Sequence, residues 1–299
     1  MSILIKQRSI DTSHGSLAVE EVGQGGIPVL LIHGNSTCRD VFRHQLEGRL
    51  AENHHFIAFD LPGHGESSNA PDPMRTYTRS GLADAAIELL KKLGETEVIV
   101  FGWSLGGHVG MEMLTRFPGT RGLMITGAPP VGPHTMAQGF KSTPQHGVAG
   151  KPDLSEADID AFIQAMFGAS ARSSLHDAMV RADGRFRKRL FDAVRAGEGV
   201  DQRLIVESSP VPLAVVNGGA DGMINLDYFD TIAYANLWES HCHRLPGAGH
   251  APFWEASDDF NPVLERFLRD VENCLGGDAR VRTKFHTLES HRNSTDQVR

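Results

Sequence analysis

Three residues with complementary chemistry, a serine, an aspartate and a histidine, each follow an apolar segment of the sequence. Ser104 is the centre of GWSLG (102–106), a G-x-S-x-G pattern that stands between an apolar β-type segment and a helical pattern. Asp221 and His250 each come shortly after a further β-type segment. Since ligands of an open parallel sheet bind beyond the carboxyl ends of its strands, we expect these three residues at one site.

Together the three side chains could perform nucleophilic catalysis. A serine hydroxyl is a weak nucleophile at neutral pH and needs an adjacent imidazole to accept its proton. The imidazole needs a carboxylate that fixes its tautomer and stabilises its positive charge. We therefore predict Ser104 as the nucleophile, His250 as the base and Asp221 as its acid partner. Asp227 is the alternative acid, but it falls inside a helical pattern, whereas Asp221 lies on the loop after its strand. The plainer alternatives are a glycine-rich turn with a capping serine and a loop histidine without a partner.

The turn at Ser104 is expected to hold a strained backbone, with flanking glycines because a Cβ there would collide with neighbouring elements. The helix begins at the serine, so backbone N–H groups point toward an oxyanion that forms beside it. We predict the N–H of Leu105 as one oxyanion donor. The loop after the apolar segment 28–32, which reads HGN, supplies the other, and we assign it to the N–H of Asn35. The Asn35 side chain could also touch substrate; the alternative is that HGN is only a turn.

Apolar segments alternate with helical patterns over most of the chain. Short continuous apolar runs bounded by Gly, Pro or Asn predict buried strands, and this alternation predicts a mostly parallel sheet with helices on both faces. The expected strands are residues 3–11, 16–22, 28–32, 56–59, 97–101, 123–126, 211–216 and 241–245, and the expected helices outside the insertion are 40–50, 78–93, 108–116, 226–234 and 257–275.

Residues 131–208 interrupt this alternation. They contain no convincing buried strand and show helical patterns near 155, at 174–181 and at 185–196. Ser155 and Asp158 match a capping box at the start of the first of these helices. We therefore predict a helical cap at 131–208, inserted into a core made of 1–130 and 209–275. The tail, 276–299, lacks an apolar period and is expected to be disordered or a peripheral arm.

Composition excludes several partners and cofactors. The formal net charge of −8 argues against nucleic acid or an anionic membrane as a partner, and no apolar run approaches the roughly 20 residues that span a bilayer. We see no signal peptide at the N-terminus. The odd, widely spaced cysteines, Cys38, Cys242 and Cys274, suggest free thiols in a reducing compartment, and cytoplasmic location is the default expectation. We expect no cofactor, because the glycines around 102–107 lack dinucleotide-binding spacing, and no metal, because His241 and His243 have no evident further ligands.

Several segments carry a resemblance to a known family over roughly residues 12–273. LLIHGN, FDLPGHGES, VFGWSLGGHVGMEM, LMITGAPP, VVNGGAD and GAGHAPFWEA resemble the α/β-hydrolases with a helical cap. This resemblance implies an α/β-hydrolase fold with a mostly parallel eight-stranded sheet, and its members carry their triad in the chain order Ser, Asp or Glu, His. GWSLGGHVGMEM, RGLMITGAPP and AGHAPFWEA are similar to the N-acyl-homoserine lactonases of this fold, which open the lactone ring of bacterial quorum-sensing signals without a metal. Those lactonases can carry Glu at the acid position, where this chain has Asp221, and Tyr in the first cap helix, where it has Phe162.

The resemblance implies a serine hydrolase that acts on a small-molecule lactone or ester, with N-acyl-homoserine lactones as the expected substrate and quorum quenching as the consequence. Alternatives are a general carboxylesterase, a C–C bond hydrolase, a hydroxynitrile lyase or a perhydrolase-like enzyme, and a binding module without turnover. Cap core is an equal explanation for the apolar cap residues. Acyl-chain preference and oligomeric state depend on packing that the sequence does not give. Residues expected to contact substrate are Gly34, Trp103, Phe140, Phe162, Met166, Phe167 and Trp254.

Overall fold

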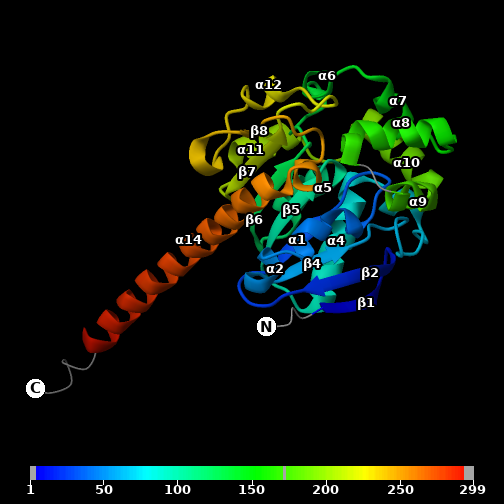
Figure 1. The fold of residues 1–299 in the computed structure, drawn as a ribbon. Coiled ribbons are helices and arrows are strands. Elements are labelled where there is room, and N and C mark those ends of the chain that lie inside the picture. Colours follow the sequence, from blue (N-terminus) through cyan, green and yellow to red (C-terminus); the bar gives the residue numbers. More distant parts are fainter. Residues whose placement is uncertain (1–4, 171–172, 293–299) are drawn as a thin grey trace, which may run out of the picture.

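The computed structural model describes residues 5–170 and 173–292, with side chains outside 144–146, 169 and 276–292. Its centre is an eight-stranded sheet in the order β1-β2-β4-β3-β5-β6-β7-β8 (Figure 1). The predicted strands are confirmed with small shifts of their ends. They are β1 (Ile5–Thr12), β2 (Gly15–Val22), β3 (Val29–Ile32), β4 (Phe56–Phe59), β5 (Val98–Trp103), β6 (Thr120–Thr126), β7 (Leu213–Gly218) and β8 (His243–Leu245).

The strand directions place the carboxyl ends of the central strands at one edge. β2 pairs antiparallel with β1 and β4, and every pair from β4 to β8 is parallel. The strands that precede Ser104, Asp221 and His250 are β5, β7 and β8, so the loops that follow them open on the same side. The predicted α/β class and mostly parallel sheet are therefore confirmed.

Each face of the sheet packs against its own layer of helices. Successive side chains of a strand point to opposite faces. Leu30 and Ile32 accordingly contribute to one core, and Val29 and Leu31 to the other. The first core includes α4 (Arg79–Leu93), α5 (Leu105–Arg116) and α12 (Leu226–Phe229). The second includes η1 (Arg39–Phe42), α1 (Arg43–Leu46), α2 (Leu50–Asn53), α13 (Pro252–Glu255) and the start of α14 (Ser257–Arg292).

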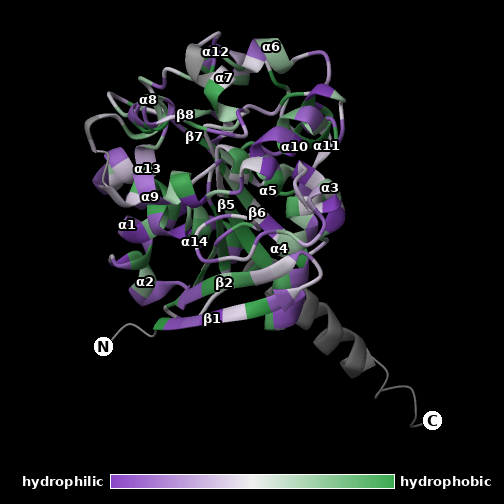
Figure 2. Cartoon of the chain, turned by 90° about the vertical axis from the view of Figure 1, so that its right-hand side faces the viewer, coloured by the Kyte–Doolittle hydropathy of each residue, from purple (hydrophilic) through white to green (hydrophobic). Residues whose placement is uncertain are grey.

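Hydropathy follows this layering. Figure 2 shows the hydrophobic colour concentrated in the central strands, whereas β1 at the sheet edge is largely hydrophilic. Burial agrees, since all residues of β5 are buried and most of β1 is exposed. The connecting elements α3 (Pro73–Thr76) and η3 (Trp238–Ser240) complete the core outside the cap.

Two predicted helices differ from the structure. The helix expected at 40–50 is broken into η1, α1 and α2, because Asp60 Oδ1 accepts the backbone N–H of Arg39 at 2.7 Å and Gly48, a poor helix former, separates the last two. The helix expected at 226–234 ends at Phe229, before the β-branched Thr231 and Ile232. The tail, expected to be disordered or a peripheral arm, continues α14 through Arg292; residues 293–299 lie outside the described part.

The insertion between β6 and β7 is helical in the part described, apart from a single antiparallel bridge between Phe140 and Ile224. The predicted capping box is present: Ser155 Oγ accepts from the Asp158 N–H, and the Asp158 carboxylate accepts from the Ser155 N–H. The helix at 202–208 packs against α5 of the core, rather than over the site. The elements are α6 (Met136–Gly139), α7 (Pro144–Ala149), α8 (Glu156–Phe167), η2 (Gly168–Ser170), α9 (Ser173–Arg181), α10 (Gly184–Arg195) and α11 (Gln202–Ser208).

Candidate active site

Ser104 occupies a sharp turn between β5 and α5. Its backbone has φ 53° and ψ −116°, a conformation that costs a non-glycine residue about 1–3 kcal/mol and persists only where the surroundings enforce it. Close packing supplies the enforcement: a Cβ at Gly102 would overlap the Gly106 carbonyl, and one at Gly106 would overlap the Ile32 carbonyl. The glycines predicted to permit this turn are therefore required by the space available.

Asp221 and His250 meet beyond the ends of β7 and β8. His250 Nδ1 lies 2.7 Å from Asp221 Oδ2, and both side chains are buried. Asp221 Oδ1 accepts the backbone N–H of Met223 at 2.7 Å and that of Ile224 at 3.3 Å. Burial by itself would raise the pKa of the Asp221 carboxyl, but the nearby His250 and these hydrogen bonds outweigh it and lower that pKa. An ionised Asp221 keeps the His250 proton on Nδ1 and leaves Nε2 as the basic nitrogen.

The loop that carries His250 is held on both sides by one carboxylate. Glu255 Oε2 accepts the N–H of Gly249 and Oε1 accepts the N–H of Ala251, both at 3.0 Å. The Trp103 indole N–H donates to the His250 carbonyl at 2.9 Å. The backbone on each side of the histidine is thus fixed by Glu255 and Trp103, neither of which forms part of the predicted triad.

The His250 ring packs directly against the backbone after β6. A Cβ on Gly127, which has a φ of +63°, would lie 2.6 Å from His250 Cε1. The Gly127 N–H donates to Asn217 Oδ1 at 2.8 Å, and Asn217 is buried. Glycine is therefore needed at 127 both for its backbone conformation and for the space that the imidazole occupies.

Ser104 and His250 face one cavity. His250 Nε2 is buried and has no hydrogen-bond partner in the part of the chain described, and the Ser104 hydroxyl makes no hydrogen bond there either. Hydrogen bonds between a nucleophile and its base are often formed only when substrate is bound. The free Nε2 is the atom that the predicted mechanism requires to accept the serine proton.

Both predicted oxyanion donors remain available. Neither the Leu105 N–H nor the Asn35 N–H donates to another group among residues 5–170 and 173–292. The Asn35 side chain lines the cavity, and its Nδ2 donates to the Ala149 carbonyl of the cap at 3.0 Å; contact with substrate stays a prediction. The next residue, Ser36, has a φ of 58°, and its hydroxyl accepts from Arg187 Nη1 of α10 at 3.2 Å. Two cap contacts therefore support the loop that carries the Asn35 N–H.

His64 is a buried histidine that connects two loops near the site. Its Nε2 accepts the Ser36 N–H at 3.2 Å, and its Nδ1 lies 3.1 Å from the Pro62 carbonyl. Burial lowers the pKa of His64 well below its usual value, so the ring is neutral and acts as a hydrogen-bond bridge between loops.

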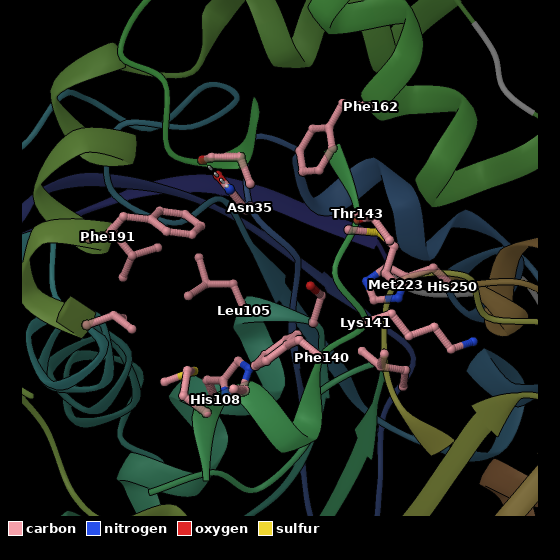
Figure 3. Close-up of a pocket in the computed structure, with 18 of the residues that line it drawn as sticks. Asn35, Leu105, His108, Phe140, Lys141, Thr143, Phe162, Phe191, Met223 and His250 are labelled. Carbon is pink, nitrogen blue, oxygen red and sulfur yellow. Dashed lines mark hydrogen bonds between the residues drawn. The ribbon is translucent and has the colours of Figure 1, made fainter. Parts of the chain in front are cut away.

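The cavity has a volume of about 490 Å³, and side chains of the core and the cap surround it (Figure 3). Of the residues expected to contact substrate, Phe140 and Phe162 line it. Gly34, Trp103, Met166, Phe167 and Trp254 are not among its lining residues, and for them substrate contact stays a prediction. The Trp103 ring packs under Gly34, where a Cβ would lie 2.9 Å from it, and Met166, Phe167 and Trp254 are buried in the second core.

Several lining residues were not predicted. Lys141 joins the cap to the acid loop: its Nζ donates to the Asp221 carbonyl at 2.6 Å, and its N–H donates to the Met223 carbonyl at 3.0 Å. His108 and Arg79 also line the cavity. His108 follows Ser104 by four residues, so helical spacing could have placed it on the same face of α5, whereas no sequence signal identifies Arg79.

The structure adds a third group to the pair formed by His241 and His243, the first residue of β8. Glu239, His241 and His243 bring possible metal ligands within 4.8 Å of one another, which the sequence did not indicate. Arg266 already donates to both Glu239 oxygens, at 2.8 and 3.3 Å, and so neutralises this carboxylate. The expectation of no metal stays a prediction.

The three cysteines are free thiols, and burial raises the pKa of Cys242 to about 11. Within the described helices, none combines the length and the apolar character that a membrane crossing requires.

Comparisons with known proteins agree with this geometry. A model described as "Alpha/beta hydrolase family" matches residues 29–263. A crystal structure of the N-acyl homoserine lactonase AidH, complexed with N-butanoyl homoserine, superposes with a TM-score of 0.88 at 45% identity, covering 89% of this chain and 97% of that one.

Curated relatives are more distant. A 2-hydroxy-6-oxononadienedioate/2-hydroxy-6-oxononatrienedioate hydrolase from Pseudomonas sp is 24% identical and covers 85% of this chain and 92% of its own. A pimeloyl-[acyl-carrier protein] methyl ester esterase from Stenotrophomonas maltophilia (strain R551-3) is 25% identical and covers 86% and 98%.

Proposed function

The chain belongs to the alpha/beta hydrolase family, and we propose that it is a serine hydrolase that opens the lactone ring of N-acyl-homoserine lactones. The observation that carries this proposal is the meeting of Ser104, on its strained turn, and the unpartnered His250 Nε2 at one cavity. The 45% identity to an N-acyl homoserine lactonase supports the choice of substrate. Ring opening would remove the intact lactone on which quorum sensing depends.

In the first step, Ser104 Oγ attacks the lactone carbonyl while His250 Nε2 takes the serine proton. Asp221 remains ionised and stabilises the imidazolium that forms. The negative charge on the carbonyl oxygen is held by the N–H groups of Leu105 and Asn35, which are preorganised by the helix start and by the cap contacts. Expulsion of the ring oxygen gives an acyl-enzyme, and His250 donates its proton to that oxygen, which becomes an alcohol within the same molecule.

In the second step, water attacks the acyl-enzyme. His250 Nε2 accepts a proton from the water, the same two N–H groups hold the second oxyanion, and the proton then passes to Ser104 as the ester bond breaks. The product is the N-acyl-homoserine carboxylate. No metal or cofactor takes part in this scheme, because the imidazole supplies both proton transfers.

Phe162 bears on how the lactone is held. Where the lactonases that this chain resembles can carry Tyr, Phe162 lines the cavity without a hydroxyl, so it cannot donate a hydrogen bond to substrate. We therefore assign orientation of the lactone to the oxyanion donors, and the role of Phe162 to apolar contact with the acyl chain.

Ring opening of N-hexanoyl-homoserine lactone by the wild type and by Ser104→Ala tests the proposal. We expect the variant to lose at least about 10³-fold in kcat, because the nucleophile is absent. Ser142→Ala is the matched control, since Ser142 lines the same cavity but has no part in the scheme. Equal rates for the wild type and Ser104→Ala would refute the mechanism.

A general carboxylesterase is the second candidate, favoured by the esterase among the curated relatives. It predicts cleavage of p-nitrophenyl esters with no turnover of the lactone. Product analysis on a C–C bond substrate separates the third possibility, which the dienedioate hydrolase suggests.

A further inference from the structure

Two polar side chains line the cavity but have no part in the proposed reaction. His108 lies on α5 one turn after Ser104, and Arg79 is the first residue of α4. Figure 3 draws His108 beside Phe140 and on the side of the cavity away from His250, and the two rings are 6.1 Å apart. The lining of the cavity also includes the apolar side chains of Leu105, Leu190, Phe191 and Val194.

The contacts of His108 fix its tautomer. Gln202 Nε2 donates to the His108 carbonyl at 3.0 Å, which orients the amide so that its Oε1 faces His108 Nδ1 at 2.7 Å. An amide oxygen only accepts, so Nδ1 must carry the proton and Nε2 the lone pair. This Nε2 makes no hydrogen bond within the described residues. Burial, and then the nearby Arg79, lower the pKa of His108 to about 4, so the ring is neutral at pH 7.

Two nitrogens of the Arg79 guanidinium donate no hydrogen bond to a described residue. Arg79 is only 8% exposed, yet its Nε has no hydrogen-bond partner in the described structure. Its Nη2 donates to the Glu198 carbonyl at 3.0 Å, and its Nη1 makes no hydrogen bond with a described residue. The nearest carboxylate, Glu112, is 4.0 Å from Nε and accepts instead from Ser80 and Val200.

The cavity lining therefore includes an unused donor, on Arg79, and an unused acceptor, His108 Nε2, beside the apolar side chains of Leu105, Leu190 and Phe191. A hydroxyl can satisfy both groups at once because it donates and accepts. A ketone can satisfy only Arg79. A plain alkyl chain satisfies neither group and removes water from both. Because buried polar groups that lose their partners cost free energy, such a site discriminates strongly against a chain without the hydroxyl.

We propose that Arg79 and His108 form a hydroxyl-binding subsite, so that the enzyme prefers N-acyl-homoserine lactones whose acyl chain carries a 3-hydroxyl group. The subsite rests on the proposed function for the identity of the ring, but not for the recognition of the hydroxyl. Its distance fits: His108 follows Ser104 by four residues, which is about 6 Å along a helix axis, and carbon 3 of the acyl chain is roughly 6 Å from the lactone carbonyl when extended.

The test measures three lactones as competitive inhibitors of p-nitrophenyl acetate hydrolysis: N-hexanoyl-, N-(3-oxohexanoyl)- and N-(3-hydroxyhexanoyl)-homoserine lactone. This readout reports binding whether or not the lactones are turned over. We expect the hydroxy compound to bind about tenfold more tightly than the unsubstituted one, with the oxo compound between them. Ring opening of the same compounds is followed separately, so failure of the lactonase proposal is seen as inhibition without turnover.

Variants separate the two groups of the subsite. His108→Phe removes the acceptor, so the advantage of hydroxy over oxo should disappear while the advantage of oxo over unsubstituted is retained. Gln202→Leu keeps the ring but releases the tautomer, and should reduce the hydroxyl advantage if His108→Phe does not fold. His176→Phe is the matched control, because His176 is an exposed cap histidine that pairs with Glu156.

A purely structural role for His108 would weaken all three lactones equally. Equal weakening of all three lactones by His108→Phe would overturn the proposed subsite. Equal inhibition by the three lactones in the wild type, or no inhibition by any of them, would also overturn it.

Discussion

Glu255→Gln should impair catalysis although Glu255 does not line the cavity. In the wild type its two carboxylate oxygens accept the N–H groups of Gly249 and Ala251, on either side of His250. A glutamine has one carbonyl oxygen and can replace one of these bonds. Its NH₂ group would face the other backbone N–H, leaving that donor without an acceptor and pushing the loop away.

The size of the effect follows from the bond that is lost. A hydrogen bond to a charged group contributes about 1.5–3 kcal/mol, which corresponds to about a 10- to 100-fold fall in the population of the correctly placed loop. Two further contacts restrain His250 independently, the indole of Trp103 and the carboxylate of Asp221. We therefore expect kcat to fall about tenfold, at the lower end of this range, with KM little changed.

The assay is ester or lactone hydrolysis, together with the rate at which a fluorophosphonate labels Ser104. Both reactions need the imidazole, so both should slow in parallel. Glu272→Gln is the matched control, since Glu272 lies on α14 and accepts the N–H of Ile27 at 3.2 Å, remote from the cavity. If Glu255→Gln retained full kcat, or if Glu272→Gln lost as much, the positioning role of Glu255 would be refuted.

Three further changes test the surroundings of His250. Asp221→Asn should lower kcat by about 10⁴-fold through the wrong imidazole tautomer, measured at saturating substrate, and a loss below tenfold would argue for another acid. Because the folded state lowers the pKa of Asp221, its carboxylate stabilises the fold above about pH 4 and this contribution is lost as pH falls further. Acid unfolding should therefore show wild type and Asp221→Asn converging below that pH, and a constant difference would contradict the assignment. Gly127→Ala should lower kcat by at least about tenfold, because the new Cβ would meet His250 Cε1. It should also lower the free energy of unfolding by about 1–2 kcal/mol in denaturant, because φ at 127 is positive. An unchanged kcat would refute the packing argument.

The central strands of the sheet were predictable because each is a short apolar run with glycine or proline nearby in the sequence. Val29–Ile32 and Phe56–Phe59 are buried on both faces, so every residue in them is apolar. Such a run can be recognised as a strand from the sequence alone. The triad candidates share this property, since strand ends are visible in the sequence and parallel strands place them together. Helix ends were harder, because tertiary contacts such as that of Asp60 with Arg39 decide where they break.

Cavity lining was the least predictable part. Trp103 and Met166 have side chains suitable for an acyl pocket, but the structure buries both in the core beneath it. Whether an apolar cap residue faces the cavity or the core depends on how the helices of the insertion settle on the sheet. Arg79 lines the cavity without any signal in the sequence, and the unsatisfied atoms of His108 and Arg79 are visible only in three dimensions.

Three contacts between the cap and the core limit how freely the cap could be exchanged for the cap of another protein of this fold. The cap is inserted between β6 and β7, and the loops bearing Ser104, Asp221 and His250 all lie outside it, so a chimera with another cap would keep all three residues of the predicted triad. Yet Ala149 and Arg187 hold the loop of Asn35 and Ser36, and Lys141 holds the carbonyl of Asp221. A chimera with a foreign cap would therefore need equivalent contacts before Ser104, Asp221 and His250 could support hydrolysis at the native rate.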